Sequence, residues 1–185
     1  MRLFIAINLP PNETDRLSRA LYQLALYDVA VRWGDAASLH VTLKFLGEVT
    51  DSKLPSVRAA LQDAIVETPP FHVAVHGLGA FPSLARPNIF WIGVAGGDEL
   101  LNLQRRIDEA MAGLGFESED RPYKPHITLG RARKDGRVAD RKVMDRMAAE
   151  FDYKCEFKVE SVELMRSKLT PRGARYDVVE RMELF

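Results

Sequence analysis

The chain has little that would form a disulfide, bind a metal through cysteine or cross a membrane. Its 185 residues include one cysteine, Cys155, so neither an internal disulfide nor a cysteine-based zinc site can form. No apolar run approaches the roughly 20 residues of a membrane-spanning helix, and the short apolar run at the N-terminus lacks a signal-peptide cleavage site. We therefore expect a soluble, cytoplasmic protein without membrane contact.

Net charge is also absent, because 26 basic residues balance 26 acidic ones. The molecule as a whole is not attracted to nucleic acid, so any contact with RNA must come from local charge. The length suits one domain with a connected core. We expect a single two-lobed domain over residues 1–185, acting as a monomer.

The pattern of apolar residues and turn signals predicts an α+β chain. The expected strands are 2–9, 29–33, 38–46, 71–75, 88–94, 123–131, 153–169 (one long strand or a bent one) and 175–184, and the expected helices are 12–28, 51–67, 98–114 and 140–150. A Gly/Pro-rich loop is expected over 77–87, and a turn at 170–173 joins the last two strands into a hairpin.

These elements repeat along the chain. The order strand, helix, strand, helix, strand describes residues 1–78 and again residues 88–169, followed by the C-terminal strand 175–184. Phe4 precedes His40 by 36 residues, and Phe90 precedes His126 by the same number. This pattern predicts two lobes built from duplicated β-α-β-α-β units with pseudo-two-fold symmetry. Antiparallel-rich sheets would line a central cleft, with the helices outside.

The two central strands of the repeat each carry a His-x-Thr motif, His40-Val41-Thr42 and His126-Ile127-Thr128. With six threonines in the chain, four histidines give about 0.13 such pairs by chance, so two at matching places are informative. Residues i and i+2 of a strand share a face. Each motif therefore directs an imidazole and a hydroxyl to the same side.

Two imidazoles and two hydroxyls match the needs of phosphodiester hydrolysis. One histidine can deprotonate water while the other protonates the leaving oxygen. The two hydroxyls can donate hydrogen bonds to the two non-bridging oxygens, where negative charge accumulates. We expect no metal and no cofactor, since no carboxylate cluster lies beside either motif. The motifs alone do not say which histidine is the acid.

The chain resembles the two-histidine phosphoesterase superfamily, and within it the RNA 2′,3′-cyclic phosphodiesterases, also called 2′-5′ RNA ligase-like proteins. The resemblance runs over most of the sequence, through RLFIAINLP, LHVTLKFLGEV, FPSLARPNIFWIGV, KPHITLGRAR and LMRSKLTPRGARY. It implies hydrolysis of an RNA 2′,3′-cyclic phosphate end to a 2′-phosphomonoester, with His40 as proton donor and His126 as base. Joining of tRNA halves by the reverse, 2′-5′ ligating reaction is a secondary expectation.

Three further residues are candidates for substrate binding. Lys44 lies four residues after His40, hence on the cleft face of a regular strand, where it would meet a phosphate or remain a solvated lysine. Arg131 begins a basic stretch with Arg133, Lys134, Arg137, Arg141 and Lys142, which would contact an RNA backbone or form a solvated charged face. Phe81 or Tyr123 would stack on a base, and Phe81 is favoured because it lies in the FP element of the family. Trp91 is expected in the core.

Other functions fit parts of the pattern. A related enzyme would act on a different cyclic phosphate, such as a cyclic nucleotide or an ADP-ribose cyclic phosphate. A non-catalytic module that binds RNA ends would not need two titrating groups in addition to both hydroxyls. A histidine-based metal hydrolase would lose its activity to a strong chelator.

Overall fold

A nine-stranded antiparallel sheet forms the centre of the molecule, here a computed structural model that describes residues 1–134, 136, 140–171 and 173–185. The strands are β1 (Arg2–Asn8), β2 (Val31–Trp33), β3 (His40–Glu48), β4 (Phe71–Ser83), β5 (Arg86–Ala95), β6 (His126–Ala132), β7 (Lys154–Val159), β8 (Ser161–Thr170) and β9 (Gly173–Glu183). The helices are α1 (Pro11–Ala25), α2 (Leu54–Ile65), α3 (Gly97–Gly113) and α4 (Arg141–Glu150), with a short 3-10 turn at Ala36–Ser38. The predicted α+β class is confirmed.

The sheet has the order β7-β4-β5-β6-β3-β1-β8-β9, with β2 paired to the free part of β6. The two motif strands, β6 and β3, lie next to each other in the middle. An offset of 86 residues relates the halves, since His126 follows His40 and α3 follows α1 by that number. Four strands thus lie on each side of the junction in matching order, consistent with the duplication inferred from the sequence.

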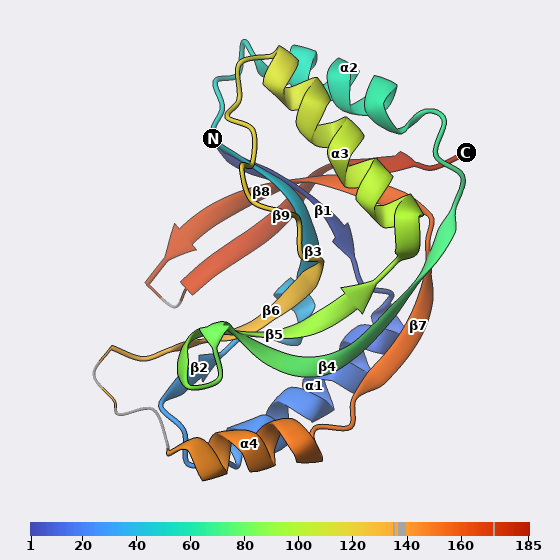
Figure 1. Ribbon diagram of the computed structural model, residues 1–185. Coiled ribbons are helices and arrows are strands. Elements are labelled where there is room, and N and C mark those ends of the chain that lie inside the picture. The colour runs from blue at the N-terminus through green and yellow to red at the C-terminus, as the bar shows by residue number, and fades with distance from the viewer. Residues whose placement is uncertain (135, 137–139, 172) are drawn as a thin grey trace.

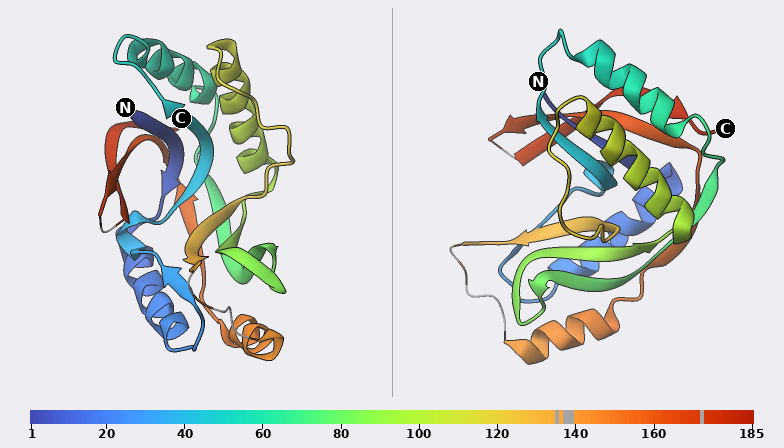
Figure 2. Two further views of the ribbon diagram at one scale, coloured as in Figure 1. Left: turned by 90° about the vertical axis from the view of Figure 1, so that its left-hand side faces the viewer. Right: turned by 45° about the horizontal axis from the view of Figure 1, so that its top comes forward.

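The helices cover the outer face of the curled sheet in two pairs (Figures 1 and 2). Helices α2 and α3 lie over the part formed by β3, β1, β8 and β9, whereas α1 and α4 lie over the part formed by β6, β5, β4 and β7. Buried leucines at 17, 21 and 24 give α1 its apolar side. Because the helices cover only the outer face, the inner face is left for function.

Two details of the fold differ from the sequence-based expectation. The segment 77–87, expected to be a loop, forms the paired ends of β4 and β5, which meet in a tight hairpin between Ser83 and Arg86. The sequence halves also do not each form a lobe. Strand β4 belongs to the first half but pairs with β5 and β7 of the second, because a short hairpin is the easiest pairing to close.

Candidate active site

The two His-x-Thr motifs meet as neighbours within the sheet. Val41 pairs directly with Ile127, and both side chains are buried in the core. Because the strands are antiparallel, His40 lies beside Thr128 and Thr42 beside His126, on the opposite, inner face. The sequence-based prediction that the motifs share one site agrees with this placement. They stand side by side as a two-by-two array and do not face each other across a gap.

Both imidazoles are fixed by the same backbone contact. Nδ1 of His40 is 2.9 Å from the carbonyl oxygen of Ser38, and Nδ1 of His126 is 2.6 Å from that of Lys124. A carbonyl oxygen only accepts hydrogen bonds, so each Nδ1 carries a proton. Each Nε2 is then free to take a proton from a substrate or, when protonated, to give one.

His40 lies against aromatic rings of its own half of the sheet. The centroid of Phe4 is 4.7 Å from that of His40, and the ring of Tyr176 meets His40 edge-on at 5.1 Å. Phe4, Ala6 and Met165 form a small buried cluster on the inner face, with Tyr176 packed against it. Burial among these groups lowers the pKa of His40 below that of an ordinary histidine, because desolvation disfavours the imidazolium.

His126 has a similar pair of aromatic neighbours. The ring of Phe81 meets it edge-on at 5.1 Å, and Trp91 lies 6.4 Å away. Gly79 makes this possible, since a Cβ there would come within 2.2 Å of the Trp91 indole. Phe81, Trp91 and His126 line a pocket of about 250 Å³ together with Ala80, Pro82, Lys124 and Pro125. Phe81 lies against His126, and its stacking on a base stays a prediction, whereas the expectation that Trp91 belongs to the core is wrong.

Lys44 does not lie on the inner face, contrary to the sequence-based expectation. A β-bulge falls between Thr42 and Lys44, so the alternation of the strand slips by one residue. Lys44 is 6% exposed and turns toward α3, where Nζ lies 2.5 Å from the carboxylate of Asp108 and also donates to the carbonyl of Glu117. Phe45 takes the inner position and is 70% exposed.

Strand β6 carries an equivalent bulge, which brings Arg131 to the inner face. The irregularity falls between Thr128 and Gly130, 86 residues after its counterpart in β3. Arg131 is exposed and pairs directly with Arg32 of β2. Two like charges placed opposite each other repel, and a bound anion would relieve this repulsion. Of the remaining basic stretch, Arg137 lies outside the described residues.

Tyr123 links the two motifs without being free to stack on a base. Its hydroxyl donates a 2.8 Å hydrogen bond to the backbone carbonyl of Thr42, although it lies three residues before His126. Burial raises the pKa of this phenol, so it stays protonated and remains a donor. Sequence patterns gave no signal for this contact, nor for Arg32 and Phe45, because each depends on strand register.

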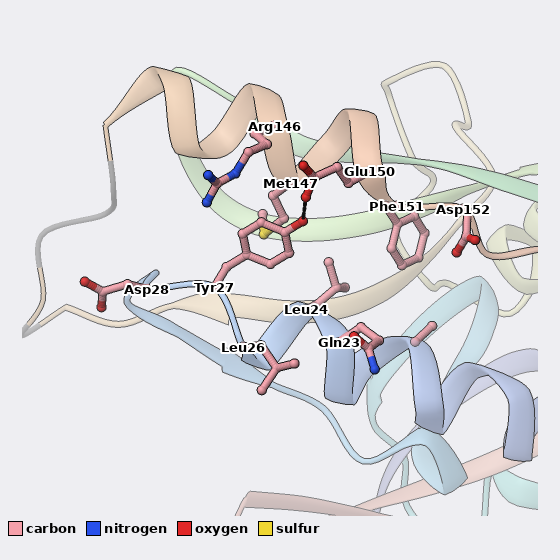
Figure 3. A pocket seen from close by; sticks show the side chains of 11 residues that line it. Gln23, Leu24, Leu26, Tyr27, Asp28, Arg146, Met147, Glu150, Phe151 and Asp152 are labelled. Carbon is pink, nitrogen blue, oxygen red and sulfur yellow. Dashed lines mark hydrogen bonds between the residues drawn. The ribbon is translucent and has the colours of Figure 1, made fainter.

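A larger cavity of about 730 Å³ lies away from the motifs, between α1 and α4 (Figure 3). Leu24, Met147 and Phe151 contribute apolar surface to it, and the Tyr27 hydroxyl donates to Glu150 at its edge. None of the four motif residues lines this cavity. Its side chains offer no acid–base pair like that of the inner face, so we place the candidate active site at the motifs.

Within the described ranges, no three His, Cys, Asp or Glu side chains gather closely enough to hold a metal ion. In the same part of the chain, none of the helices is both long enough and apolar enough to span a bilayer.

Comparison with known proteins places these features in a family. The family model of the 2′-5′ RNA ligase superfamily matches residues 12–170, a range that contains both motifs. The chain belongs to this superfamily. Among its curated relatives is an RNA 2′,3′-cyclic phosphodiesterase of Methanothermobacter thermautotrophicus, 32% identical over all of this chain and 99% of the relative. The enzyme of the same name from Archaeoglobus fulgidus is 34% identical over 95% of this chain and 96% of the relative.

Solved structures of similar proteins agree with this fold over the whole chain. TT0787 of Thermus thermophilus superposes with a TM-score of 0.81 at 28% identity, covering 100% of this chain and 98% of that one. Escherichia coli LigT in complex with 3′-AMP gives a TM-score of 0.79 at 25% identity, covering 99% and 97%. The fold of the curled sheet is therefore shared with these proteins.

Proposed function

We propose that this protein hydrolyses the 2′,3′-cyclic phosphate at the end of an RNA to a 2′-phosphomonoester, with His40 and His126 as acid and base. The observation that carries the proposal is the two-by-two array of His40, Thr42, His126 and Thr128, with both Nδ1 atoms held by backbone carbonyls. The names of its curated relatives, at 32–34% identity over nearly full length, support the RNA cyclic phosphate as substrate.

The reaction needs two proton transfers, one from the attacking water and one to the leaving oxygen. Nε2 of His126 takes a proton from water as the oxygen attacks phosphorus, and protonated Nε2 of His40 gives its proton to O3′ as the P–O3′ bond breaks. O2′ stays on phosphorus, so the product is a 2′-phosphomonoester. The two imidazoles finish with their protonation states exchanged and regain them through solvent. This assignment of acid and base follows from the family resemblance.

The hydroxyls of Thr42 and Thr128 would hold the non-bridging oxygens. Each lies next to the histidine of the other strand, so both donors border the place where the phosphoryl group must sit. A donor aimed at developing negative charge stabilises the transition state more than the ground state. This chemistry needs no metal ion, since the proton transfers and charge stabilisation come from the four side chains.

The aromatic pocket beside His126 suits the base of the terminal nucleotide. Phe81 and Trp91 present ring surfaces next to the imidazole, and stacking on such rings is how proteins hold unpaired bases. Arg131 with Arg32 would attract the RNA backbone to the inner face. A 5′-hydroxyl of a second RNA in place of water would give the 2′-5′ linkage of the ligating reaction.

Product analysis on a short RNA that ends in a 2′,3′-cyclic phosphate tests the proposal. We expect conversion to the 2′-phosphate, unchanged in the presence of a strong chelator. Inhibition by the chelator would indicate a metal hydrolase, and tight binding without turnover would indicate an RNA-end-binding module. Faster hydrolysis of a cyclic mononucleotide or an ADP-ribose cyclic phosphate would assign a different substrate.

A further inference from the structure

Three exposed apolar side chains lie on the inner face of the half of the sheet that carries His40. Phe45 of β3, Leu169 of β8 and Val178 of β9 are 70%, 77% and 53% exposed. Large side chains exposed in this way and grouped on one surface commonly mark a binding site. We refer to Phe45, Leu169 and Val178 as the inner apolar surface.

Strand register places these three residues on one face. Val178 pairs with Met165, whose side chain belongs to the buried cluster with Phe4 under His40. Leu169 follows Met165 by four residues and so points to the same side. Phe45 pairs with Phe4, and their ring centroids are 6.1 Å apart. Phe4 in turn touches His40, so the inner apolar surface is continuous with the active site.

A cation borders this surface. Arg2 is exposed and lies two residues before Phe4 on the same face of β1, about 7 Å along the strand. Arg181 lies on the same face but forms ion pairs with Glu183 and Glu163, whereas Arg166 and Lys168 lie on the opposite face of β8 and form ion pairs with Asp177. The inner apolar surface and the guanidinium of Arg2 therefore offer an aromatic ring for a base and a cation for a phosphate, as a bound nucleotide needs.

The chemistry of the reaction indicates which nucleotide would lie there. If His40 protonates O3′, it faces the C3′ side of the terminal ribose. C3′ is bonded to C4′, which carries the chain toward the 5′ end, whereas the terminal base leaves from C1′ on the other side. The RNA chain thus leaves the active site on the side of His40, over the inner apolar surface.

We propose that the inner apolar surface and Arg2 bind the nucleotide that precedes the terminal one. This inference rests on the proposed function and on His40 as the proton donor. The preceding base stacks on Phe45 and its phosphate lies near Arg2, while Val178 and Leu169 extend the apolar face farther along the sheet. The subsite makes the protein discriminate RNA ends from cyclic mononucleotides, which have no such nucleotide.

Substrate length is the variable that tests this subsite. We compare kcat/KM for a 2′,3′-cyclic mononucleotide and for a trinucleotide with the same terminal residue, using Phe45→Ala and Phe45→Trp. Loss of a base stack costs on the order of ten-fold. We expect about that loss for Phe45→Ala on the trinucleotide alone, and recovery in Phe45→Trp. Tyr22→Ala, which removes an exposed ring from α1, is the matched control and should change neither rate.

Each other result has a distinct meaning. Equal losses on both substrates would show that Phe45 acts through His40, and no loss would show that the RNA does not cross this surface; either overturns the subsite. A length-dependent loss in Arg131→Gln, with none in Phe45→Ala, would place the RNA on the other half of the sheet. Wild-type protein that hydrolyses neither substrate would contradict the proposed function itself, and the subsite with it.

Discussion

At the scale of single residues, the two histidines share an anchor but differ in their surroundings. Each donates a hydrogen bond from its Nδ1–H to a backbone carbonyl two residues earlier in the chain. His40 is also packed between Phe4 and Tyr176, and burial there lowers its pKa. Near neutral pH the free protein therefore holds His40 mostly in the neutral form. A bound phosphodiester anion favours the imidazolium, so the substrate itself would help to create the proton donor.

This predicts a pKa for His40 below the usual value of about 6.5 in the free protein, and a higher one with inorganic phosphate bound. An NMR titration of the His40 ring protons measures both. Because of this lowered pKa, the unfolded chain binds the His40 proton more readily than the folded protein does. The contribution of His40 to the free energy of unfolding is therefore fully present above pH ~6.5 and is lost as the pH falls toward the folded-state pKa. A free-protein pKa above 6.5, or no rise with phosphate, would contradict this account of His40.

The hydroxyls should matter less than the imidazoles. Replacing Thr42 or Thr128 by valine keeps the shape of the side chain and removes one hydrogen bond to a charged oxygen, which is worth about 1.5–3 kcal/mol. We expect each variant to lose roughly ten- to a hundred-fold in kcat/KM at unchanged stability, measured on an RNA with a cyclic phosphate end. Rates equal to those of the wild type in both variants would mean that neither hydroxyl contacts the phosphoryl group.

At the scale of elements, the sequence predicted which face of each strand carries the motif, but it did not predict which face the residues after the motif occupy. The i, i+2 rule correctly placed His40 with Thr42 and His126 with Thr128 on one face. It failed for Lys44, because a bulge after each threonine shifts the alternation. A bulge depends on how neighbouring strands pair, and no local feature of this sequence predicts it. Phe45 was missed for the same reason.

The corrected place of Lys44 makes it a stabilising residue. Its ammonium joins β3 to Asp108 of α3 and to the backbone at Glu117. Lys44→Met would leave the largely buried carboxylate of Asp108 without its partner, which costs about 2 kcal/mol or more. We expect a clear loss in the free energy of urea unfolding, with KM unchanged. Lys168→Met, on the exposed hairpin, is the control. A raised KM with unchanged stability would support the original expectation of substrate contact.

At the scale of the whole molecule, the repeat identified which elements are equivalent but not which are neighbours. The spacing of 36 residues from Phe4 to His40 and from Phe90 to His126 correctly indicated two related halves. It could not indicate that β4 would join β5 and β7 or that α1 would lie with α4, because those contacts join different halves. The candidate active site lies where the halves meet, at the pair Val41 and Ile127.

The central claim is that both histidines carry out proton transfer on an RNA cyclic phosphate. Hydrolysis of an RNA with a 2′,3′-cyclic phosphate end by wild type, His40→Ala and His126→Ala, with His72→Ala as the exposed-histidine control, tests it most directly. We predict a 2′-phosphate product and losses of about 10²- to 10⁴-fold in each motif variant, at near wild-type stability and with an unchanged control. A wild-type rate in either motif variant would contradict the claim.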